Sequence, residues 1–319
     1  MKKFLALVCA ILMLLSMTAC VPEGASDGKY VIGICQYAPH DALDAATAGF
    51  KQAVIDGLGA ENVEFKEENA AGETANCTTI INSLVSAKVD LIMANATPAL
   101  QTAANATRSI PVLGTSVTEY GLALGIDDFS GTVGTNVSGT SDLAELKLQA
   151  EMLMEWFPDA KKVGLLYCSG EPNSLYQVEE IAKYLGQKSV TCQKFAFSDS
   201  NDMATVVRDA AAWSDVIYIP TDNAVANATD VVDSICRPAK VPVIAGEEGI
   251  CSGCGVATLS ISYYDLGYTT GQMAVKILKG EVKVSEMPIE YTTATKKYNA
   301  EICAALGIEP KDGYEKIGK

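Results

Sequence analysis

The chain has 319 residues, of which 49% are hydrophobic and 20% are charged, and its formal net charge is −15. A half-apolar chain of this size can bury a large core and usually forms two domains. The acidic excess repels phosphate groups, which argues against nucleic acid and anionic lipid headgroups as binding partners.

The first twenty residues have the pattern of an export signal. Two lysines precede an apolar run over residues 4–15, which is too short to span a membrane. Small residues then lead to Cys20, an ending that resembles a bacterial lipoprotein signal, in which this cysteine is lipidated. We expect a signal peptide at residues 1–19, a lipidated tether at residues 20–28, and an extracytoplasmic protein anchored to the cell membrane. Plain secretion is the alternative.

From residue 29 onward, short runs rich in β-branched residues alternate with longer segments of helical periodicity. This alternation predicts an α/β fold with parallel sheets covered by helices on both faces. The predicted strands are residues 30–35, 63–66, 89–94, 112–115, 163–167, 190–195, 216–219 and 241–245, and the predicted helices are residues 45–58, 74–87, 99–107, 143–157, 175–185, 203–212, 226–236 and 264–278.

The alternation is interrupted over residues 119–139, which are rich in Gly, Thr, Asp and Ser, and then restarts with a long helix. Two comparable units joined in this way predict two doubly wound parallel-sheet lobes with a hinge and a cleft between them. Ligands of open parallel sheets bind beyond the carboxyl ends of the strands. Two such edges that face each other would form a site that can close.

Polar residues follow the predicted strands in both halves of the chain. A helix N-terminus suits a carboxylate, and a lone acid such as Asp222 suits an ammonium group, so together these loops indicate a receptor for a zwitterion. Each polar residue could instead be a simple helix cap, so the interpretation depends on their recurrence in both halves. The loops are residues 36–44, 95–98, 116–119, 168–174, 220–223 and 246–248.

At these loops the chain resembles the tryptophan/tyrosine-type ABC transporter substrate-binding proteins, a lipoprotein family with the type I periplasmic-binding-protein fold. The matching segments run in the same order through most of the mature chain. They include Gly33-Ile34, Gly49-Phe50, Asp90-Leu91-Ile92, Thr97-Pro98, Ile110-Pro111-Val112, Asn136-Val137-Ser138-Gly139, Glu171 with Asn173-Ser174, Pro220-Thr221-Asp222-Asn223, Tyr263-Tyr264 and Leu306-Gly307-Ile308.

The resemblance implies three crossings between the lobes, at residues 131–139, 259–264 and 289–293. The N-terminal lobe is then expected to comprise residues 29–135 plus 264–290, and the C-terminal lobe residues 136–263 plus 291–319.

The resemblance also implies which residues bind the ligand. Five are expected to line the cleft and hold the amino and carboxylate groups of an amino acid, and two are expected near its side chain. The first group is Thr97, Ser116, Asn173, Ser174 and Asp222, and the second is Tyr37 and Glu247.

We therefore expect a monomeric receptor that captures an aromatic amino acid, namely tryptophan, tyrosine or phenylalanine, and delivers it to an ABC permease and its ATPase. No cofactor, metal or catalytic residue is expected. The same architecture for a sugar, nucleoside or other small solute is the alternative, although Trp156 and Trp213 lie in predicted helices rather than in strand-end loops. A secreted hydrolase is a weaker alternative, because the single histidine, His40, has no convincing nucleophile partner.

Eight cysteines follow Cys20, and export makes disulfides possible. Cys251-Ser-Gly-Cys254 has the spacing of a redox pair or of half a zinc site. A zinc site would need a second pair of ligands. A local disulfide or two unreactive thiols is the simpler interpretation.

Overall fold

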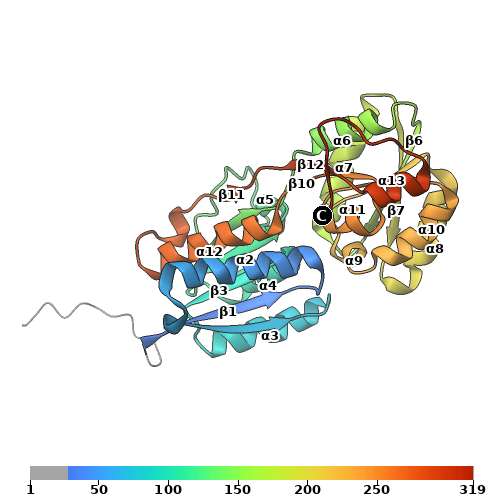
Figure 1. The fold of residues 1–319 in the computed structure, drawn as a ribbon. Helices are drawn as coiled ribbons and strands as arrows, with labels where there is room; N and C mark the ends of the chain where they lie inside the picture. The colour runs from blue at the N-terminus through green and yellow to red at the C-terminus, as the bar shows by residue number, and fades with distance from the viewer. Residues whose placement is uncertain (1–27, 319) are drawn as a thin grey trace, which may run out of the picture.

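The computed structural model describes residues 28–318, so the predicted signal peptide and Cys20 lie outside the described residues. Two lobes lie side by side, each built on one sheet with helices on both faces (Figure 1). The predicted class, an α/β protein with two parallel-sheet lobes, is confirmed. All eight predicted strands and all eight predicted helices are present, with ends that differ by a few residues.

The first lobe has a six-stranded sheet in the order β11-β5-β4-β3-β1-β2, and every pair in it is parallel. Its central strands are apolar on both faces because helices cover both faces. Its elements are β1 (Tyr30–Gln36), α2 (Asp41–Leu58), η2 (Ala60–Asn62), β2 (Val63–Asn69), α3 (Thr74–Ser86), β3 (Leu91–Asn95), α4 (Thr97–Ala106), β4 (Val112–Val117), α5 (Tyr120–Leu124), β5 (Val137–Ser141), α12 (Tyr263–Leu278), η3 (Val284–Glu286) and β11 (Glu290–Tyr291).

The second lobe has a seven-stranded sheet in the order β13-β12-β10-β9-β8-β6-β7, in which only the β10–β12 pair is antiparallel. Its elements are α6 (Leu146–Trp156), β6 (Lys162–Cys168), α7 (Pro172–Gly186), β7 (Thr191–Phe197), α8 (Ser200–Trp213), β8 (Val216–Ile219), α9 (Asn223–Ala226), α10 (Thr229–Ala239), β9 (Val243–Ala245), α11 (Glu248–Cys254), β10 (Ala257–Ser260), β12 (Thr295–Tyr298), α13 (Ala300–Leu306) and β13 (Glu315–Lys316).

Helix α12 follows the second lobe in sequence but packs against α2 of the first lobe (Figure 1). Glycines permit this close packing. A Cβ atom at Gly49 would lie 2.0 Å from the Tyr264 carbonyl oxygen, and one at Gly267 would lie 1.9 Å from the Ala46 carbonyl oxygen. Any side chain there would push the two helices apart, so these glycines fix how α12 returns to the first lobe.

The first crossing lies further along the chain than the sequence indicated. Strand β5 pairs with β4 in the first sheet, with Val137 opposite Val112, so residues 137–141 belong to the first lobe. The chain leaves this lobe after Ser141, not within residues 131–139, and Tyr291 of β11 also pairs with Ser141 there. Backbone pairing of β5 with both β4 and β11 decides this, and its small and polar residues give no apolar pattern by which the sequence would reveal a strand.

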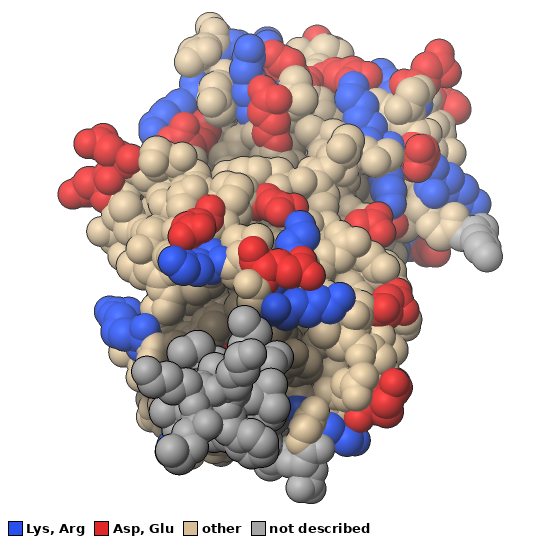
Figure 2. Space-filling view, turned by 90° about the vertical axis from the view of Figure 1, so that its left-hand side faces the viewer, with Lys and Arg blue, Asp and Glu red and all other residues tan. Residues whose placement is uncertain are grey.

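None of the helices described between residues 28 and 318 has the length and apolar character needed to cross a membrane. On the face shown in Figure 2, basic and acidic side chains are interspersed over the described surface. That face therefore lacks the concentrated positive charge that nucleic acid binding requires.

Candidate functional site

A cavity lies between the lobes, at the carboxyl ends of strands from both sheets. Its volume is only about 10 Å³, close to that of one water molecule, so the lobes close tightly on the polar groups between them and a larger guest needs them to part. The loops after β1, β4 and β5 line it from the first lobe, and the loops after β6, β8 and β9 line it from the second. Its lining residues are His40, Ala42, Leu43, Ser116, Thr118, Asp142, Asn173, Thr221, Asp222, Asn223, Ala226, Glu247 and Tyr263.

The lobes touch each other across this cavity. The hydroxyl groups of Thr118 and Thr221 lie 3.4 Å apart, and His40 Nε2 lies 3.2 Å from Asn223 Oδ1. The Asn223 amide nitrogen donates to Glu171, so its oxygen accepts from His40. Burial lowers the pKa of His40 and keeps its ring neutral. The structure is therefore that of the closed protein.

All of the buried Asp and Glu side chains among residues 28–318 lie at or beside this cavity, namely Asp142, Glu171, Asp222 and Glu247. No lysine or arginine is among the residues that line it. A buried carboxylate without a cation is costly, so this arrangement favours a ligand that brings positive charge.

Glu171 and Asp222 are buried acids in the loops that follow β6 and β8 on the second lobe's side of the cavity. Glu171 accepts hydrogen bonds from the backbone and side chain of Asn223 at 3.1 and 2.6 Å and from the Ala224 amide at 2.9 Å, and so holds the start of α9. Asp222 accepts from the Cys168 amide at 2.7 Å and the Val225 amide at 3.0 Å. Burial and the neighbouring Asp222 raise the pKa of Glu171 to about 8, and burial also raises the pKa of Asp222.

Glu247 is the N-cap of α11. Its carboxylate accepts hydrogen bonds from the amides of Gly249 and Ile250, which would otherwise be unpaired at the helix start. Burial raises the pKa of Glu247 to about 7 despite these donors. The carboxyl group is thus held rigidly at the cavity wall.

Asp142 directly follows β5, where the chain leaves the first lobe. The Tyr263 hydroxyl donates to Asp142 Oδ2 at 3.0 Å, while Oδ1 is buried without a hydrogen-bond partner among the described residues. Burial raises the pKa of Asp142 to about 6, against the opposing effects of Tyr263 and Thr118.

Three polar atoms without partners among the described residues converge on the cavity. They are Asp142 Oδ1, Ser116 Oγ and Asn173 Oδ1, and all three residues line it. The Asn173 amide nitrogen donates to Glu171 and to the Thr221 carbonyl at 3.1 Å each, which leaves its oxygen free as an acceptor. Buried polar groups are rarely left unpaired, so a cluster of them marks a place where a ligand completes the bonding.

Residues 31–313 match the family model described as "ABC transporter substrate binding protein". The chain belongs to this family. As a substrate-binding protein of an ABC transporter, it is an extracytoplasmic binding component and not an enzyme.

The relatives of this substrate-binding protein agree with that assignment. It is 32% identical over 305 residues to a tyrosine-binding protein of Clostridioides difficile, covering 90% of this chain and 87% of the relative. A crystal structure of an ABC domain in complex with L-Trp from Streptococcus pneumoniae has a TM-score of 0.86 at 30% identity, covering 90% of this chain and 99% of that one.

A third relative bears on the conformation. A ligand-free, open structure of a substrate-binding protein with adhesive properties from Clostridium difficile is 36% identical and covers 91% of this chain and 99% of that one, but its TM-score is only 0.70. The L-Trp complex is less similar in sequence and more similar in shape. The ligand-free, open relative therefore superimposes less well on this structure than the L-Trp complex does.

Four of the seven predicted site residues line the cavity, and the other three, Tyr37, Thr97 and Ser174, are buried residues outside that lining. Tyr37 is buried after β1, and burial together with the charge of Glu171 raises its pKa. Thr97 is buried as the first residue of α4, and the Ser174 hydroxyl accepts from the Asn173 amide at 3.3 Å. The four at the wall are Ser116, Asn173, Asp222 and Glu247.

Several groups that the structure places at the site are absent from the seven predicted residues. Glu171 belongs to a strand-end loop, and its position just before a helix was the available signal. Asp142 and Tyr263 lie at crossings between the lobes, and no local pattern marks such positions. Thr118 and Thr221 contact each other only because the lobes close.

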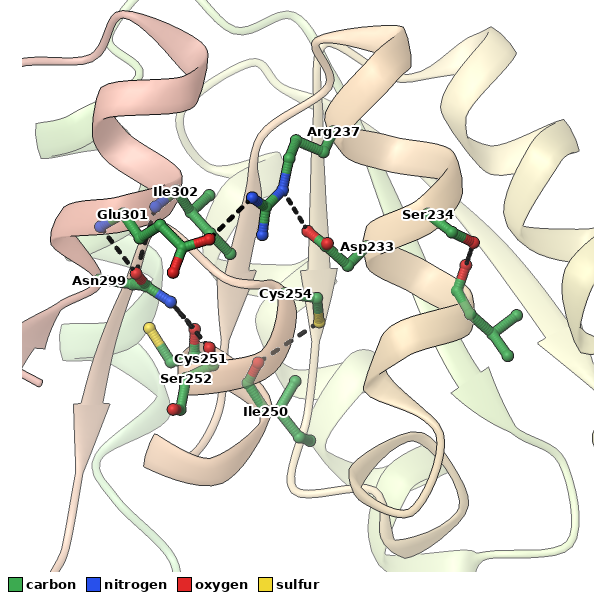
Figure 3. A network of polar contacts seen from close by, with 11 residues as sticks. Asp233, Ser234, Arg237, Ile250, Cys251, Ser252, Cys254, Asn299, Glu301 and Ile302 are labelled. Atoms are coloured by element: carbon green, nitrogen blue, oxygen red, sulfur yellow. Dashed lines mark hydrogen bonds and ion pairs between the residues drawn. The ribbon is translucent and has the colours of Figure 1, made fainter. Parts of the chain in front are cut away.

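Helix α11 begins directly after Glu247. Contacts from the start of α13 hold this helix, and with it Glu247, in the second lobe. Figure 3 shows Asn299 donating to the carbonyls of Cys251 and Ser252, at 3.1 and 2.8 Å, while its own oxygen accepts from the first turn of α13. Cys251 and Cys254 are buried free thiols, and Cys254 donates to the Ile250 carbonyl at 3.3 Å. The two thiols therefore pack as core residues of α11.

Proposed function

We propose that this protein is the receptor of an ABC importer and holds one aromatic amino acid between its closed lobes. The observation that carries the proposal is the interlobe cavity itself, in which buried carboxyl groups have no basic partner and three polar atoms have no partner at all among residues 28–318. A zwitterion supplies the missing charge and the missing hydrogen bonds together.

The ligand carboxylate is expected to face the N-terminus of α2. His40, Ala42 and Leu43 line the cavity from this end of an 18-residue helix, and no side chain of the described residues caps it. Free amide groups and the helix dipole attract an anion there, and the Asp41 and Asp44 carboxylates of the first turn oppose part of that attraction. The Ser116 hydroxyl lies on the same lobe and can donate to the same group.

The ligand side chain is proposed to be aromatic. Leu43, Ala226 and the ring of Tyr263 supply apolar surface in the cavity. A tyrosine-binding protein and a structure with L-Trp bound are among the relatives, which supports an aromatic guest. Neither tryptophan lines the cavity: Trp156 packs against Tyr314 and Trp213 against Phe195, so neither offers a surface on which a sugar ring could stack.

The wider assignment rests on the family and the leader sequence. We propose that Cys20 carries the lipid anchor, that the protein acts as a monomer, and that a permease with its ATPase receives the ligand. Closure would present the two lobe surfaces to the permease in one fixed relation.

Calorimetry against the twenty amino acids tests the ligand assignment. The protein should first be unfolded and refolded to remove any ligand carried through purification. We expect binding of at least one of tryptophan, tyrosine and phenylalanine, with compaction in X-ray scattering on addition. The absence of binding by all three would overturn the aromatic assignment.

A further inference from the structure

The buried carboxyl groups at the cavity differ in how many hydrogen bonds they already accept. Each oxygen of Glu171, Asp222 and Glu247 accepts from at least one amide of the second lobe. Asp142 Oδ2 accepts from Tyr263, and Asp142 Oδ1 is the one oxygen of the set without a donor among the described residues. A ligand ammonium group would give Asp142 Oδ1 its first hydrogen bond, whereas at the other oxygens it would only add to bonds that already exist.

Asp142 is held rigidly by its surroundings. Its amide donates to the Val117 carbonyl at 3.2 Å, and the adjacent Ser141 hydroxyl donates to the Thr118 carbonyl at 2.8 Å. The side chain is 5% exposed and lines the cavity. Its free oxygen is therefore a buried, fixed acceptor on a residue that lines the site.

Asp142 and Tyr263 also join two of the crossings between the lobes. Asp142 follows β5 at the first crossing, and Tyr263 begins α12 at the second. The hydrogen bond between them spans 121 residues of sequence. A charge on Asp142 therefore lies at the end of β5, where the chain passes from the first lobe to the second.

We propose that Asp142 is the counter-ion that receives the ammonium group of the ligand, with Tyr263 positioning it. This proposal rests on the proposed amino acid function and names one residue for it. Capture of the ammonium would neutralise a charge at the junction of the lobes, so occupancy and closure would favour each other. Asp222 and Glu171 then attract the ammonium group at longer range, through their negative electrostatic potential.

Other charged and titratable groups face Asp142, and they act in the same direction. Glu247 from the start of α11 interacts electrostatically with Asp142, and Tyr263 from α12 donates to it. Tyr120 from α5 is close enough for Asp142 to raise its pKa. None of these groups supplies a positive charge, so the ammonium has no competitor there.

The test replaces Asp142 by asparagine and measures the affinity for L-tyrosine and L-tryptophan by calorimetry. The substituted side chain would keep an oxygen acceptor for Tyr263 but offer an uncharged amide to the ammonium. We expect Asp142→Asn to weaken binding about 10- to 100-fold. Asp159→Asn, at an exposed site in the second lobe, is the matched control and should leave the affinity unchanged.

The des-amino analogues, 3-(4-hydroxyphenyl)propionate and indole-3-propionate, separate a charge contact from a general disturbance. Wild type and Asp142→Asn should bind an analogue with affinities within about twofold of each other. An equal loss for amino acid and analogue would overturn the proposal, as would an unchanged amino acid affinity. Since wild type is measured in parallel, failure of wild type to bind any amino acid would instead refute the proposed function.

Two further measurements keep the test valid. Circular dichroism and thermal unfolding should show that ligand-free Asp142→Asn is folded and at least as stable as wild type, because an unpaired buried charge has been removed. Tyr263→Phe should weaken amino acid binding by a smaller factor, about threefold to tenfold, through loss of positioning. An effect of Tyr263→Phe on the analogue as large as on the amino acid would contradict the positioning role.

Discussion

The two lobes present different chemistry to the same cavity. The first contributes the Ser116 and Thr118 hydroxyl groups and the uncapped start of α2, and no acid of residues 28–141 is buried. The second contributes the buried carboxyl groups of Glu171, Asp222 and Glu247. A receptor for a zwitterion needs both halves, because an ammonium and a carboxylate group on one carbon must meet opposite potentials on opposite sides. Asp142 lies where these halves join.

The largest expected effect concerns the second lobe, where Glu171 is both acid and scaffold. Glu171→Ala leaves the Ala224 amide and the side chain of Asn223 without a buried acceptor. We expect a loss of about 3–5 kcal/mol in the free energy of unfolding, measured by urea denaturation. Glu171→Gln, which keeps an acceptor, should lose less than half as much. Equal stability of wild type and Glu171→Ala would show that this carboxyl group serves the ligand alone.

The pH dependence of the ligand-free protein would sharpen the comparison further. Folding raises the pKa of Asp142 from 3.8 to about 6, of Glu247 from 4.5 to about 7 and of Glu171 from 4.5 to about 8. A raised pKa of an acid stabilises the folded state at low pH, and this stability is lost as the pH rises through the folded value. We therefore expect the free energy of unfolding to fall by up to about 7 kcal/mol between pH 5 and pH 8, at about 1.4 kcal/mol for each pKa unit.

Ligand affinity should depend on pH in the opposite direction. The ammonium group binds the charged carboxylates, so calorimetry should show tighter binding at pH 8 than at pH 5. Glu247→Gln should reduce the slope of both curves. Parallel slopes for stability and affinity would contradict the idea that the buried carboxyl groups at the cavity attract the positive end of the ligand.

Ser116 offers a test of the first lobe. Ser116→Ala removes an unpaired buried hydroxyl, and we expect the affinity for the amino acid to fall about tenfold, or about 1.4 kcal/mol. Because Ser116 has a positive φ of 55°, Ser116→Gly is the appropriate companion. Calorimetry should show a similar loss for both variants. A loss in the alanine variant only would indicate backbone strain instead of a missing hydrogen bond.

The smallest effect is expected at the contact between the lobes. Thr118 and Thr221 approach to 3.4 Å only when the lobes are closed. A double-mutant cycle of Thr118→Val and Thr221→Val should give a coupling of about 0.5 kcal/mol in ligand affinity. Additive losses would mean that the two hydroxyl groups act on the ligand separately and not on closure.

Much of the architecture could be predicted from local pattern. Strands such as β1 and β3 are runs of apolar residues bounded by polar loops, and the helices between them repeat with helical periodicity, so local sequence defines both. Strand β5 was missed because Val137–Ser141 has small and polar residues, and its identity depends on pairing with β4 and β11. The short helices α5, α9 and α11 have too few residues for a periodic signal.

The binding site was predicted less completely. Strand-end loops pointed to Ser116, Asn173, Asp222 and Glu247, which do line the cavity, and whether they touch the ligand stays a prediction. Thr97, the first residue of α4, does not line this cavity, and its role in ligand binding stays a prediction. A residue after a strand can face the cavity or the core, and the loop conformation decides which.

By itself the sequence determined the α/β class, the division into two lobes and the edges at which ligand groups gather, because these follow from periodicity and chain order. Only the tertiary structure decided which acids are buried, which oxygen is left unpaired, and how far the lobes close. Burial and pairing depend on what other segments bring to a group. Asp142 and Tyr263, 121 residues apart, illustrate this, since neither has a partner until the crossings meet.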